Sequence, residues 1–322
     1  MSAPLQPRRR LSRRRTLMAL AVAGAFTATS FGLAYGQGAD AGTHTAPAAA
    51  KAPAADALPT PDHTVVVIFE NHDYKKIIGS KNAPYINQLA KGGGNLTESY
   101  GLATKSQPNY MQLFSGGNQG VKDNGCYDAG FSGKANLGSE LIAAGKTWAS
   151  YNEGLPKTGD TTCKEGDYAR KHNPWFAFKN VPRDTAYTFK DFPKDFSKLP
   201  KVSFITPDLC SDMHDCSVSE GDSWLKDNLS AYAEWAKANN SLLVTTFDES
   251  VGDGPQHIST VFYGAGVKAG STTDKEYNHY NVLRTLEDLS GLKTHAGKAA
   301  ESEPITGIWE TGSGTSTPTP SS

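Results

Sequence analysis

Acidic and amide side chains follow two apolar runs that lie far apart in this chain, Thr64–Phe69 and Leu242–Phe247. Continuous β-branched and aliphatic runs of this length are typical of strands buried on both faces of a parallel sheet. Ligands bind beyond the carboxyl ends of such strands, so the polar residues would meet there if the two strands are neighbours. Clustered carboxylates repel one another and raise the pKa of at least one member, so such a cluster usually holds a cation. We therefore predict a site for one divalent metal ion, with these ligands: Glu70, Asn71, Asp248 and Glu249.

A serine beside such a metal ion would be a candidate nucleophile. Ser106 stands at the predicted start of a helix, where unpaired N–H groups and the positive end of the helix dipole suit a phosphate and favour an alkoxide. The alternative is that Ser106 is only a helix N-cap, which is the commoner role of an isolated Ser-x-Pro serine. A metal ion beside the hydroxyl would activate it for attack. Oxygen ligands suit Ca or Mg, and Fe or Zn also bind them, so the identity of the metal stays open.

Imidazole and guanidinium groups in other segments could also take part. His214 lies in the carboxylate-rich segment Pro207–Cys216, where it could protonate a leaving alkoxide or bind phosphate. The alternative for His214 is a surface position in a salt-linked loop. Arginine holds phosphate oxygens in bidentate contacts, and lysine binds them as a point charge. Taken singly, each of the other candidates is more often structural than catalytic: Arg170, Lys171, His172 and His279.

The chain contains four cysteines, and in an exported protein this number suggests two disulfides. Cys210 and Cys216 bracket a short segment, so we expect them to pair, and Cys126 and Cys163 would then close a longer loop. Closing a loop of about fifteen residues is worth about 3 kcal/mol in theory, so the longer bridge should stabilise the fold at least that much. A cysteine metal site is less favoured because no C-x-x-C spacing is present.

The first 36 residues are typical of an export signal. Six arginines precede the apolar stretch Leu17–Ala34, and small residues up to Gly36 offer a cleavage site. The segment Ser12–Leu17 resembles a twin-arginine signal that lacks only the usual Phe. A lasting membrane anchor is the alternative, but the apolar stretch is short and interrupted by polar residues. We therefore predict a secreted, extracellular protein, exported by the twin-arginine route, without a permanent membrane anchor.

The rest of the chain divides by composition. Residues 37–61 are rich in Ala and Pro and residues 311–322 in Ser, Thr and Pro, so both are predicted to be disordered. Residues 62–310 are enough for one large α/β domain. Besides the two strands above, the predicted elements are strands at Val202–Thr206 and Ser259–Tyr263 and helices at Pro84–Lys91, Gln107–Phe114, Leu137–Ala144, Glu220–Ala238 with Ser219 as its N-cap, and Tyr280–Leu289. This alternation favours an open, largely parallel sheet covered by helices on both faces.

Several motifs together resemble the bacterial phosphoesterase family, which holds phospholipases C and secreted acid phosphatases of the alkaline-phosphatase-like superfamily. The motifs that carry this resemblance are Glu70-Asn71-His72-x-Tyr74, Ser106-x-Pro108-Asn109-Tyr110, Asp212-Met213-His214-Asp215 and Asp248-Glu249. A secreted acid phosphatase branch that acts on phosphatidylinositol 3-phosphate is more similar still. Its likeness rests on Tyr168–His172, Ser241–Val244, Val261–Ala265, His279–Leu283 and Ile305–Trp309. The resemblance spans about residues 62–310, the whole predicted domain.

The resemblance implies an alkaline-phosphatase-like three-layer sandwich with a mostly parallel central sheet. It further implies that Ser106, held at the metal with its ligands, attacks phosphorus and forms a phosphoseryl intermediate while His214 assists the leaving group. The family commonly has Thr-His-Pro-Ser where this chain has Thr104-Lys105-Ser106, so Lys105 would supply a positive charge in place of the histidine. The residues expected to contact substrate are Lys105, Asn109, Arg170, His172 and His279.

These expectations favour a secreted phosphomonoesterase acting on a phosphorylated small molecule or a phosphoinositide. The alternatives are a phospholipase C-type phosphodiesterase and a non-catalytic metal- or phosphate-binding protein. A glycosidase is disfavoured because Asp248 and Glu249 are adjacent and cannot flank a sugar bond from opposite sides. Without the six arginines, 26 basic residues face 33 acidic ones, a net charge of −7 that disfavours nucleic-acid binding. We expect a monomer.

Overall fold

The computed structural model describes residues 58–127, 130–131 and 133–311. The ordered domain begins before the predicted boundary at residue 62, because Pro59 and Pro61 are buried and the Thr60 carbonyl accepts a 3.0 Å hydrogen bond from Asn240. The predicted signal peptide, most of the predicted linker and nearly all of the predicted tail lie outside the described residues. Within the described part of the chain, no helix is both long enough and apolar enough to span a membrane.

A nine-stranded sheet forms the centre of the domain, with the order β10-β2-β9-β8-β1-β7-β3-β6 and β11 paired beside β2. All its pairings are parallel except those of β9 with β2 and with β8. The strands are β1 (His63–Phe69), β2 (Gly94–Tyr100), β3 (Trp148–Asn152), β6 (Ala186–Thr188), β7 (Val202–Thr206), β8 (Ser241–Phe247), β9 (His257–Gly264), β10 (Ser271–Thr273) and β11 (Tyr277–Asn278). A separate two-stranded sheet pairs β4 (Lys164–Glu165) with β5 (Tyr168–Ala169).

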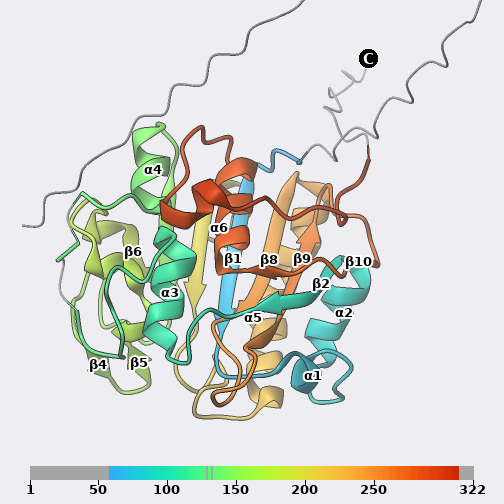
Figure 1. The fold of residues 1–322 in the computed structure, drawn as a ribbon, viewed down its shortest axis with the longest axis horizontal. Coiled ribbons are helices and arrows are strands. Elements are labelled where there is room, and N and C mark those ends of the chain that lie inside the picture. Colours follow the sequence, from blue (N-terminus) through green and yellow to red (C-terminus); the bar gives the residue numbers. More distant parts are fainter. Residues whose placement is uncertain (1–57, 128–129, 132, 312–322) are drawn as a thin grey trace, which may run out of the picture. The chain divides into compact units, whose positions relative to one another are not determined.

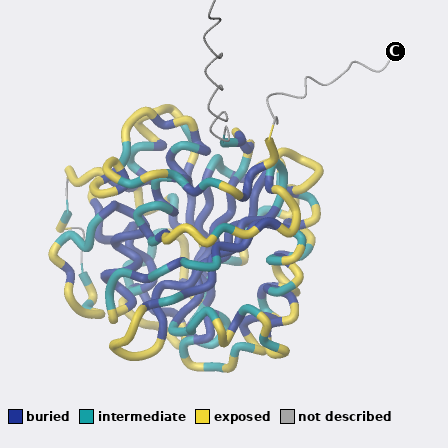
Figure 2. The backbone as a smooth tube through the Cα atoms, turned by 45° about the vertical axis from the view of Figure 1, so that its right-hand side comes forward, coloured by how far each residue is buried: buried dark blue, intermediate teal, exposed yellow. Residues whose placement is uncertain are grey.

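Helices cover both faces of this sheet (Figure 1). They are α1 (Tyr74–Ile77), α2 (Pro84–Gly92), α3 (Ser106–Ser115), α4 (Leu137–Ala143), α5 (Val218–Ala238) and α6 (His279–Leu289). Short 3₁₀ helices lie at Arg170–His172, Pro174–Ala177, Arg183–Thr185, Phe189–Asp191, Phe196–Lys198 and Gly297–Glu301. The sheet has a hydrophobic core on each face, and alternate residues of β1 point into them. Val66 packs with α3, α4 and α6, and Val65 packs with α1, α2 and α5. Figure 2 shows the buried strands at the centre and exposed turns around them. The predicted three-layer, mostly parallel fold is confirmed.

The register of the central strands brings the polar residues together. β1 lies between β7 and β8, both parallel to it, and Phe69 is paired with Phe247. Because both strands end at this pair, Glu70 and Asp248 leave the sheet at the same level. The prediction that the two apolar runs are neighbouring strands is therefore confirmed.

The start of α5 differs from the prediction. The N-cap is Ser217, whose hydroxyl accepts from the Glu220 N–H while the Glu220 carboxylate accepts from the Ser217 N–H at 2.8 Å. This reciprocal pair is a capping box, and the spacing Ser217-x-x-Glu220 was its signal. Ser219, the predicted N-cap, lies inside the helix.

The glycines at the end of α2 also allow the chain to pack closely against neighbouring segments. β2 begins at Gly94, and this strand was not predicted because its sequence is largely polar. A Cβ on Gly93 would lie 2.2 Å from the Phe262 carbonyl oxygen, and one on Gly94 would lie 2.7 Å from Ile308. These glycines therefore allow close packing of the chain against β9 and the C-terminal segment.

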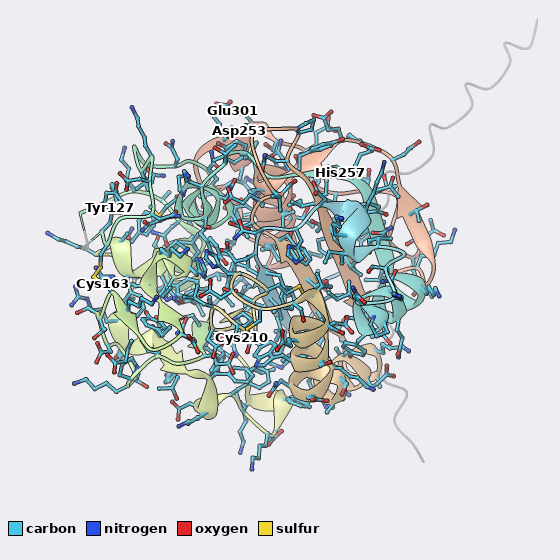
Figure 3. The ribbon with its side chains drawn as sticks, turned by 90° about the horizontal axis from the view of Figure 1, so that it is seen from below. Tyr127, Cys163, Cys210, Asp253, His257 and Glu301 are labelled. Carbon is cyan, nitrogen blue, oxygen red and sulfur yellow. A yellow bond between two sulfur atoms is a disulfide. The ribbon has the colours of Figure 1, made fainter. Side chains whose placement is uncertain are left out.

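Both predicted disulfides are present. Cys126 and Cys163 have a Cα separation of 5.7 Å, and Cys210 and Cys216 have one of 4.6 Å. Figure 3 shows the molecule from below relative to Figure 1. In this view Cys210 lies near the middle and Cys163 lies at the left margin. The two bridges thus hold separate loops.

Candidate active site

Backbone hydrogen bonds join three loops at the carboxyl ends of β7, β1 and β8. The Glu70 N–H donates to the Asp212 carbonyl at 2.9 Å. The Asn71 N–H donates to Asp248 Oδ1 at 3.1 Å. Asn71 has a φ of 56°, a left-handed conformation that asparagine tolerates better than most residues. The structure therefore brings together Glu70 and Asp248, which are 178 residues apart in sequence, and adds the carboxylate of Asp212.

Ser106 is the first residue of α3 and faces this acidic cluster. Its side chain is buried, and Oγ donates to Glu70 Oε2 at 2.8 Å. The N-cap position belongs to Lys105, and no side-chain hydrogen bond caps the helix there. The hydroxyl of Ser106 is therefore directed at a carboxylate instead of capping the helix, which argues against the N-cap alternative.

Asn109 fixes the loop that precedes Ser106. Its Oδ1 accepts from the Leu102 and Ala103 N–H groups at 2.8 and 2.9 Å. Its Nδ2 donates to the Ala103 carbonyl at 2.8 Å and to Glu249 Oε2 at 3.2 Å. Because this side chain is fully buried and uses both ends of its amide, the geometry favours a positioning role over the expected substrate contact.

His172 lies between two buried carboxylates. Its Nε2 is 2.9 Å from Glu70 Oε1 and its Nδ1 is 2.9 Å from Asp212 Oδ2. Burial alone would lower the pKa of His172, but the charges of Glu70 and Asp212 raise it to about 9. Burial raises the pKa of Glu70, yet His172 outweighs that effect and holds it at about 2. The ring of Tyr110 stacks on His172 with centroids 5.0 Å apart.

The negative charges of Asp248 and Glu249 are less well balanced by nearby cations than that of Glu70. Burial and the charge of Glu70 raise the pKa of Asp248 well above its ordinary value, and the same two causes raise that of Glu249 to about 7. His279, the first residue of α6, brings its Nε2 to 2.6 Å from the Asp248 carbonyl oxygen. Burial lowers the pKa of His279 to about 4, so the ring is neutral and Nε2 donates.

Several buried polar atoms of this cluster have no hydrogen-bond partner. The 2.9 Å contact between Glu70 Oε1 and His172 Nε2 is close but not aligned as a hydrogen bond. Glu70, His172 and Asp212 each offer a ligand atom within 4.8 Å of the others. The charged His172 already faces Glu70 and Asp212, whereas within the described residues Asp248 Oδ2 meets no cation. Since an unpaired buried carboxylate oxygen is costly unless it meets a cation, the carboxylates of Glu70 and Asp248 together fit a divalent metal ion. The unpartnered atoms are Glu70 Oε1, His172 Nε2, Asp212 Oδ2, Asp248 Oδ2, His279 Nδ1 and the Tyr110 hydroxyl.

A second group of side chains, partly accessible to solvent, lies beside the cluster. Lys171 Nζ is 3.0 Å from His214 Nε2, and His214 Nδ1 is 2.6 Å from Asp215 Oδ1. An ammonium group can only donate, so Nε2 of His214 accepts and Nδ1 carries the proton toward Asp215. The charge of Lys171 also lowers the pKa of Glu70. Lys171 is therefore the basic residue of its segment that faces the site.

Arg170 does not occupy the position expected of a phosphate ligand. It is buried, and its guanidinium contacts the Thr161 carbonyl and the sulfur of Cys126. The side chain thus ties the loop closed by Cys126 and Cys163, which corrects the expected substrate contact. The reason is local: Arg170–His172 is a 3₁₀ turn, in which successive side chains point in different directions.

Lys105 lies near the acidic cluster, whereas His257 takes no part in it. Lys105 is exposed, and its charge lowers the pKa of Glu249, as a positive group near the acidic cluster would. His257 instead stacks between the rings of Tyr74 and Tyr100, with centroids at 4.7 and 5.1 Å. Figure 3 shows His257 toward the right of the same face, well away from Cys210.

Two site residues were not assigned roles from sequence. Asp212 was seen only as one of several carboxylates in its loop, and Tyr110 only as part of a motif. The only sequence signal for Asp212 was its place at the start of the Asp212–Asp215 motif. For Tyr110, the spacing of four residues from Ser106 places both on one face of α3.

Comparisons with known proteins agree with this geometry. The sequence profile of the Phosphoesterase family matches residues 80–293. Over 258 residues the chain is 48% identical to the phosphatidylinositol-3-phosphatase of Mycobacterium tuberculosis, covering 80% of this chain and 85% of that protein. It is 31% identical to a probable acid phosphatase of Kluyveromyces lactis, covering 73% of this chain and 60% of that protein. A solved alkaline phosphatase superfamily protein from Vibrio parahaemolyticus has a TM-score of 0.56 at 12% identity, over 78% of this chain and 73% of that one, which shows the fold alone.

Proposed function

The chain belongs to the phosphoesterase family and is a phosphoric monoester hydrolase, and from this premise we propose that Ser106 is its nucleophile. One observation carries the proposal. The Ser106 hydroxyl is buried at the first residue of α3 and donates to Glu70, in a cluster where one oxygen each of Glu70, Asp212 and Asp248 has no hydrogen-bond partner. An N-cap serine would bond to its own helix, and a non-catalytic phosphate-binding protein would have no need of a serine directed at a carboxylate.

The proposed reaction proceeds by two displacements at phosphorus. Ser106 Oγ forms a bond to phosphorus as its hydroxyl proton leaves to water, and Glu70 Oε2, which stays anionic, orients the hydroxyl before the attack. The bond from phosphorus to the leaving oxygen breaks, and its electron pair goes to that oxygen. Water then attacks the phosphoserine, which releases inorganic phosphate and restores the hydroxyl. The N–H groups at the start of α3 and the charge of Lys105 favour the phosphate's negative charge.

The four predicted ligands remain our proposal for the metal site: Glu70, Asn71, Asp248 and Glu249. A divalent cation bound there would lower the pKa of the adjacent hydroxyl and offset the charge of the phosphate. His172 contacts both Glu70 Oε1 and Asp212 Oδ2, and we propose that it orients the Glu70 carboxylate. Asn109 holds Glu249 from the loop side.

Lys171 and His214 are proposed to serve the phosphate and the leaving group. In this structure Lys171 occupies the nitrogen of His214 that would donate a proton. An incoming phosphate dianion would attract the Lys171 ammonium, and His214 Nε2 would then be free to carry a proton for the leaving alkoxide. Asp215 would keep the other ring nitrogen protonated and so orient the imidazole.

We propose a phosphoinositide monoester as substrate and the extracellular space as the location. The similarity to the phosphatidylinositol-3-phosphatase of Mycobacterium tuberculosis supports the first point. Two disulfides support the second, because such bonds persist in oxidising compartments. The export route and removal of residues 1–36 rest on the sequence pattern.

Replacing the hydroxyl tests the nucleophile. Ser106→Ala should abolish turnover of p-nitrophenyl phosphate while the protein stays folded, as monitored by circular dichroism. Ser115→Ala is the matched control, because Ser115 is buried at the other end of the same helix and its hydroxyl bonds to Met111. Near-normal activity of Ser106→Ala would overturn the assignment and point to water as the nucleophile. A diester, bis-p-nitrophenyl phosphate, assayed in parallel separates the monoesterase from the phosphodiesterase alternative.

A further inference from the structure

A pocket of about 500 Å³ opens beside the acidic cluster, and its function is not explained by the reaction at Ser106. Its walls come from three segments: the turn after β1 with α1, the loop after β8, and the start of α5. Each of these segments directly follows residues of the site. α1 lies at the lower edge of the view in Figure 1, to which β1 and β8 descend. The volume is within the range of small-molecule sites, about 300–1,000 Å³.

Hydrogen bonds make the pocket wall continuous with the cluster. His72, which lines the pocket, donates its N–H to the Glu249 carbonyl at 3.2 Å. The carboxylate of Asp73, also in the lining, accepts from the hydroxyl of Ser250. Val251, two residues beyond Glu249, also lines the pocket and is 64% exposed. A group bound in this pocket would therefore be a neighbour of a group bound at the cluster.

The polar lining is suited to an anion that also carries hydroxyl groups. Lys75 and Lys76 both line the pocket and are exposed, and within the described residues neither forms an ion pair. The Ser80 hydroxyl accepts from the Asn82 N–H at 3.2 Å, so its own proton remains available to a ligand. The single acidic residue of the lining, Asp73, already accepts from Ser250. The lining thus carries a surplus of positive charge and hydrogen-bond donors.

These two lysines are distinct from the cations of the cluster. The positive charges that act on Glu249 belong to Lys105, Lys171 and His172, and those that act on Glu70 to Lys171 and His172. Lys75 and Lys76 lie on α1 and line the pocket.

We propose that this pocket binds the second anionic group of a bisphosphorylated polyol, such as the headgroup of a phosphoinositide whose ring phosphate reacts at Ser106. The proposal rests on the proposed function and adds the residues that select the substrate class. Lys75 and Lys76 hold the non-reacting phosphate, and Ser80 and Asn82 face the polyol hydroxyls. A simple aryl phosphate has no group to place there.

The test compares two substrates in the full chain. In Lys75→Ala/Lys76→Ala, kcat/KM for soluble inositol 1,3-bisphosphate should fall about tenfold or more relative to kcat/KM for p-nitrophenyl phosphate, through KM, because charged hydrogen bonds to one group are lost. Lys179→Ala/Lys190→Ala is the control: it removes the same charge from two exposed lysines that flank β6, at the far edge of the sheet. This control should leave the ratio unchanged.

Three results would overturn the pocket assignment. One is an equal loss for both substrates. Another is a ratio that matches the Lys179→Ala/Lys190→Ala control. The third is a loss confined to phosphatidylinositol 3-phosphate in phosphatidylcholine vesicles, which would show that the lysines contact the lipid surface instead of the soluble headgroup.

Failure of the proposed function would be visible separately, as absence of monoester turnover in the unmodified protein. Calorimetric titration with inositol 1,3-bisphosphate then still decides on the pocket. Weaker binding by about tenfold in Lys75→Ala/Lys76→Ala than in the unmodified protein would support it, and equal binding would refute it.

Discussion

Two buried groups of acidic side chains in this protein are balanced in different ways. At the ends of β1, β7 and β8, Glu70 and Asp212 flank His172, and lysines lie nearby. Between α4 and α6, the half-buried Glu140 lies beside the buried Glu287, and His295 is the cation that lowers the pKa of Glu140. Each of these two glutamates has a buried Oε2 without a partner. Two carboxylate oxygens that face each other have no donor unless one of them holds a proton.

The pKa directions express this difference. Glu70 is held at about 2 because His172 outweighs its burial, so it stays anionic. Burial, followed by the charge of Glu140, raises the pKa of Glu287 to about 9, although the Ala296 N–H donates to its Oε1 at 2.8 Å. The same residue type is thus prepared for a cation in one cluster and for a proton in the other. In our proposal the first arrangement serves the reaction at Ser106, whereas the second joins α4 and α6.

Amide substitution at the site should have the largest effect. Asp248→Asn removes a carboxylate whose Oδ2 has no protein partner, and we expect kcat to fall about 10²–10³-fold, as when one electrostatic contributor is lost. Added to Ser106→Ala it should cost little more, because residues that act as a unit are not additive. Steady-state assays of the single and double variants measure these losses. Additive losses would contradict the proposal that Ser106 and Asp248 act together.

Removal of divalent metal should resemble Asp248→Asn. Dialysis against a chelator is expected to lower monoester turnover by about 10²–10³-fold, and adding back Mg, Ca, Fe or Zn singly should identify the ion that restores it. Calorimetric binding of the restoring ion should weaken in Asp248→Asn but not in Glu287→Gln. Full activity after exhaustive chelation would contradict a metal in this cluster.

The paired glutamates predict a pH dependence of stability. A carboxyl group whose folded pKa lies above its ordinary 4.5 is more stable in the fold when protonated. Its contribution is therefore complete below pH 4.5 and is lost as the pH rises through about 9. Glu287→Gln mimics the protonated form. In chemical denaturation, the free energy of unfolding of this variant should therefore rise relative to that of the unmodified protein as the pH increases. A constant difference between pH 4 and 9 would mean that no proton is shared.

A change outside both clusters gives the smallest effect and a scale for the others. Ser217→Ala removes the capping box of α5 and should lower the free energy of unfolding by about 1 kcal/mol, with unchanged kcat. Urea denaturation and the standard assay measure the two quantities. A clear loss of activity would indicate that the loop from Cys210 to Cys216 depends on this cap.

The sequence predicted the parts of the site that follow apolar strands. β1, β7 and β8 are continuous buried runs, so their ends, and with them Glu70 and Asp248, could be placed in advance. β2 was missed because Asn95, Thr97 and Glu98 interrupt any apolar pattern, although packing against β9 buries part of it. Propensity cannot reveal strands that are stabilised mainly by their neighbours.

Side-chain direction in irregular segments was the other limit. Arg170 and Lys171 are equivalent by composition, but one ties a disulfide loop and the other faces His214. Likewise, Asn109 belongs to a recognisable motif, yet only the fold reveals that its amide is used up by Leu102, Ala103 and Glu249. Such assignments depend on contacts between distant parts of the chain, which periodicity does not encode.

Trapping the phosphoseryl intermediate tests the central claim most directly. The unmodified protein would be mixed with excess phosphomonoester, quenched in acid within the first turnovers, digested, and mapped by mass spectrometry. The account predicts one phosphoryl group on Ser106, absent from Asp248→Asn treated in the same way. A peptide containing Ser106 that stays unmodified at every quench time while phosphate is released would contradict it, as would a phosphoryl group on any other residue.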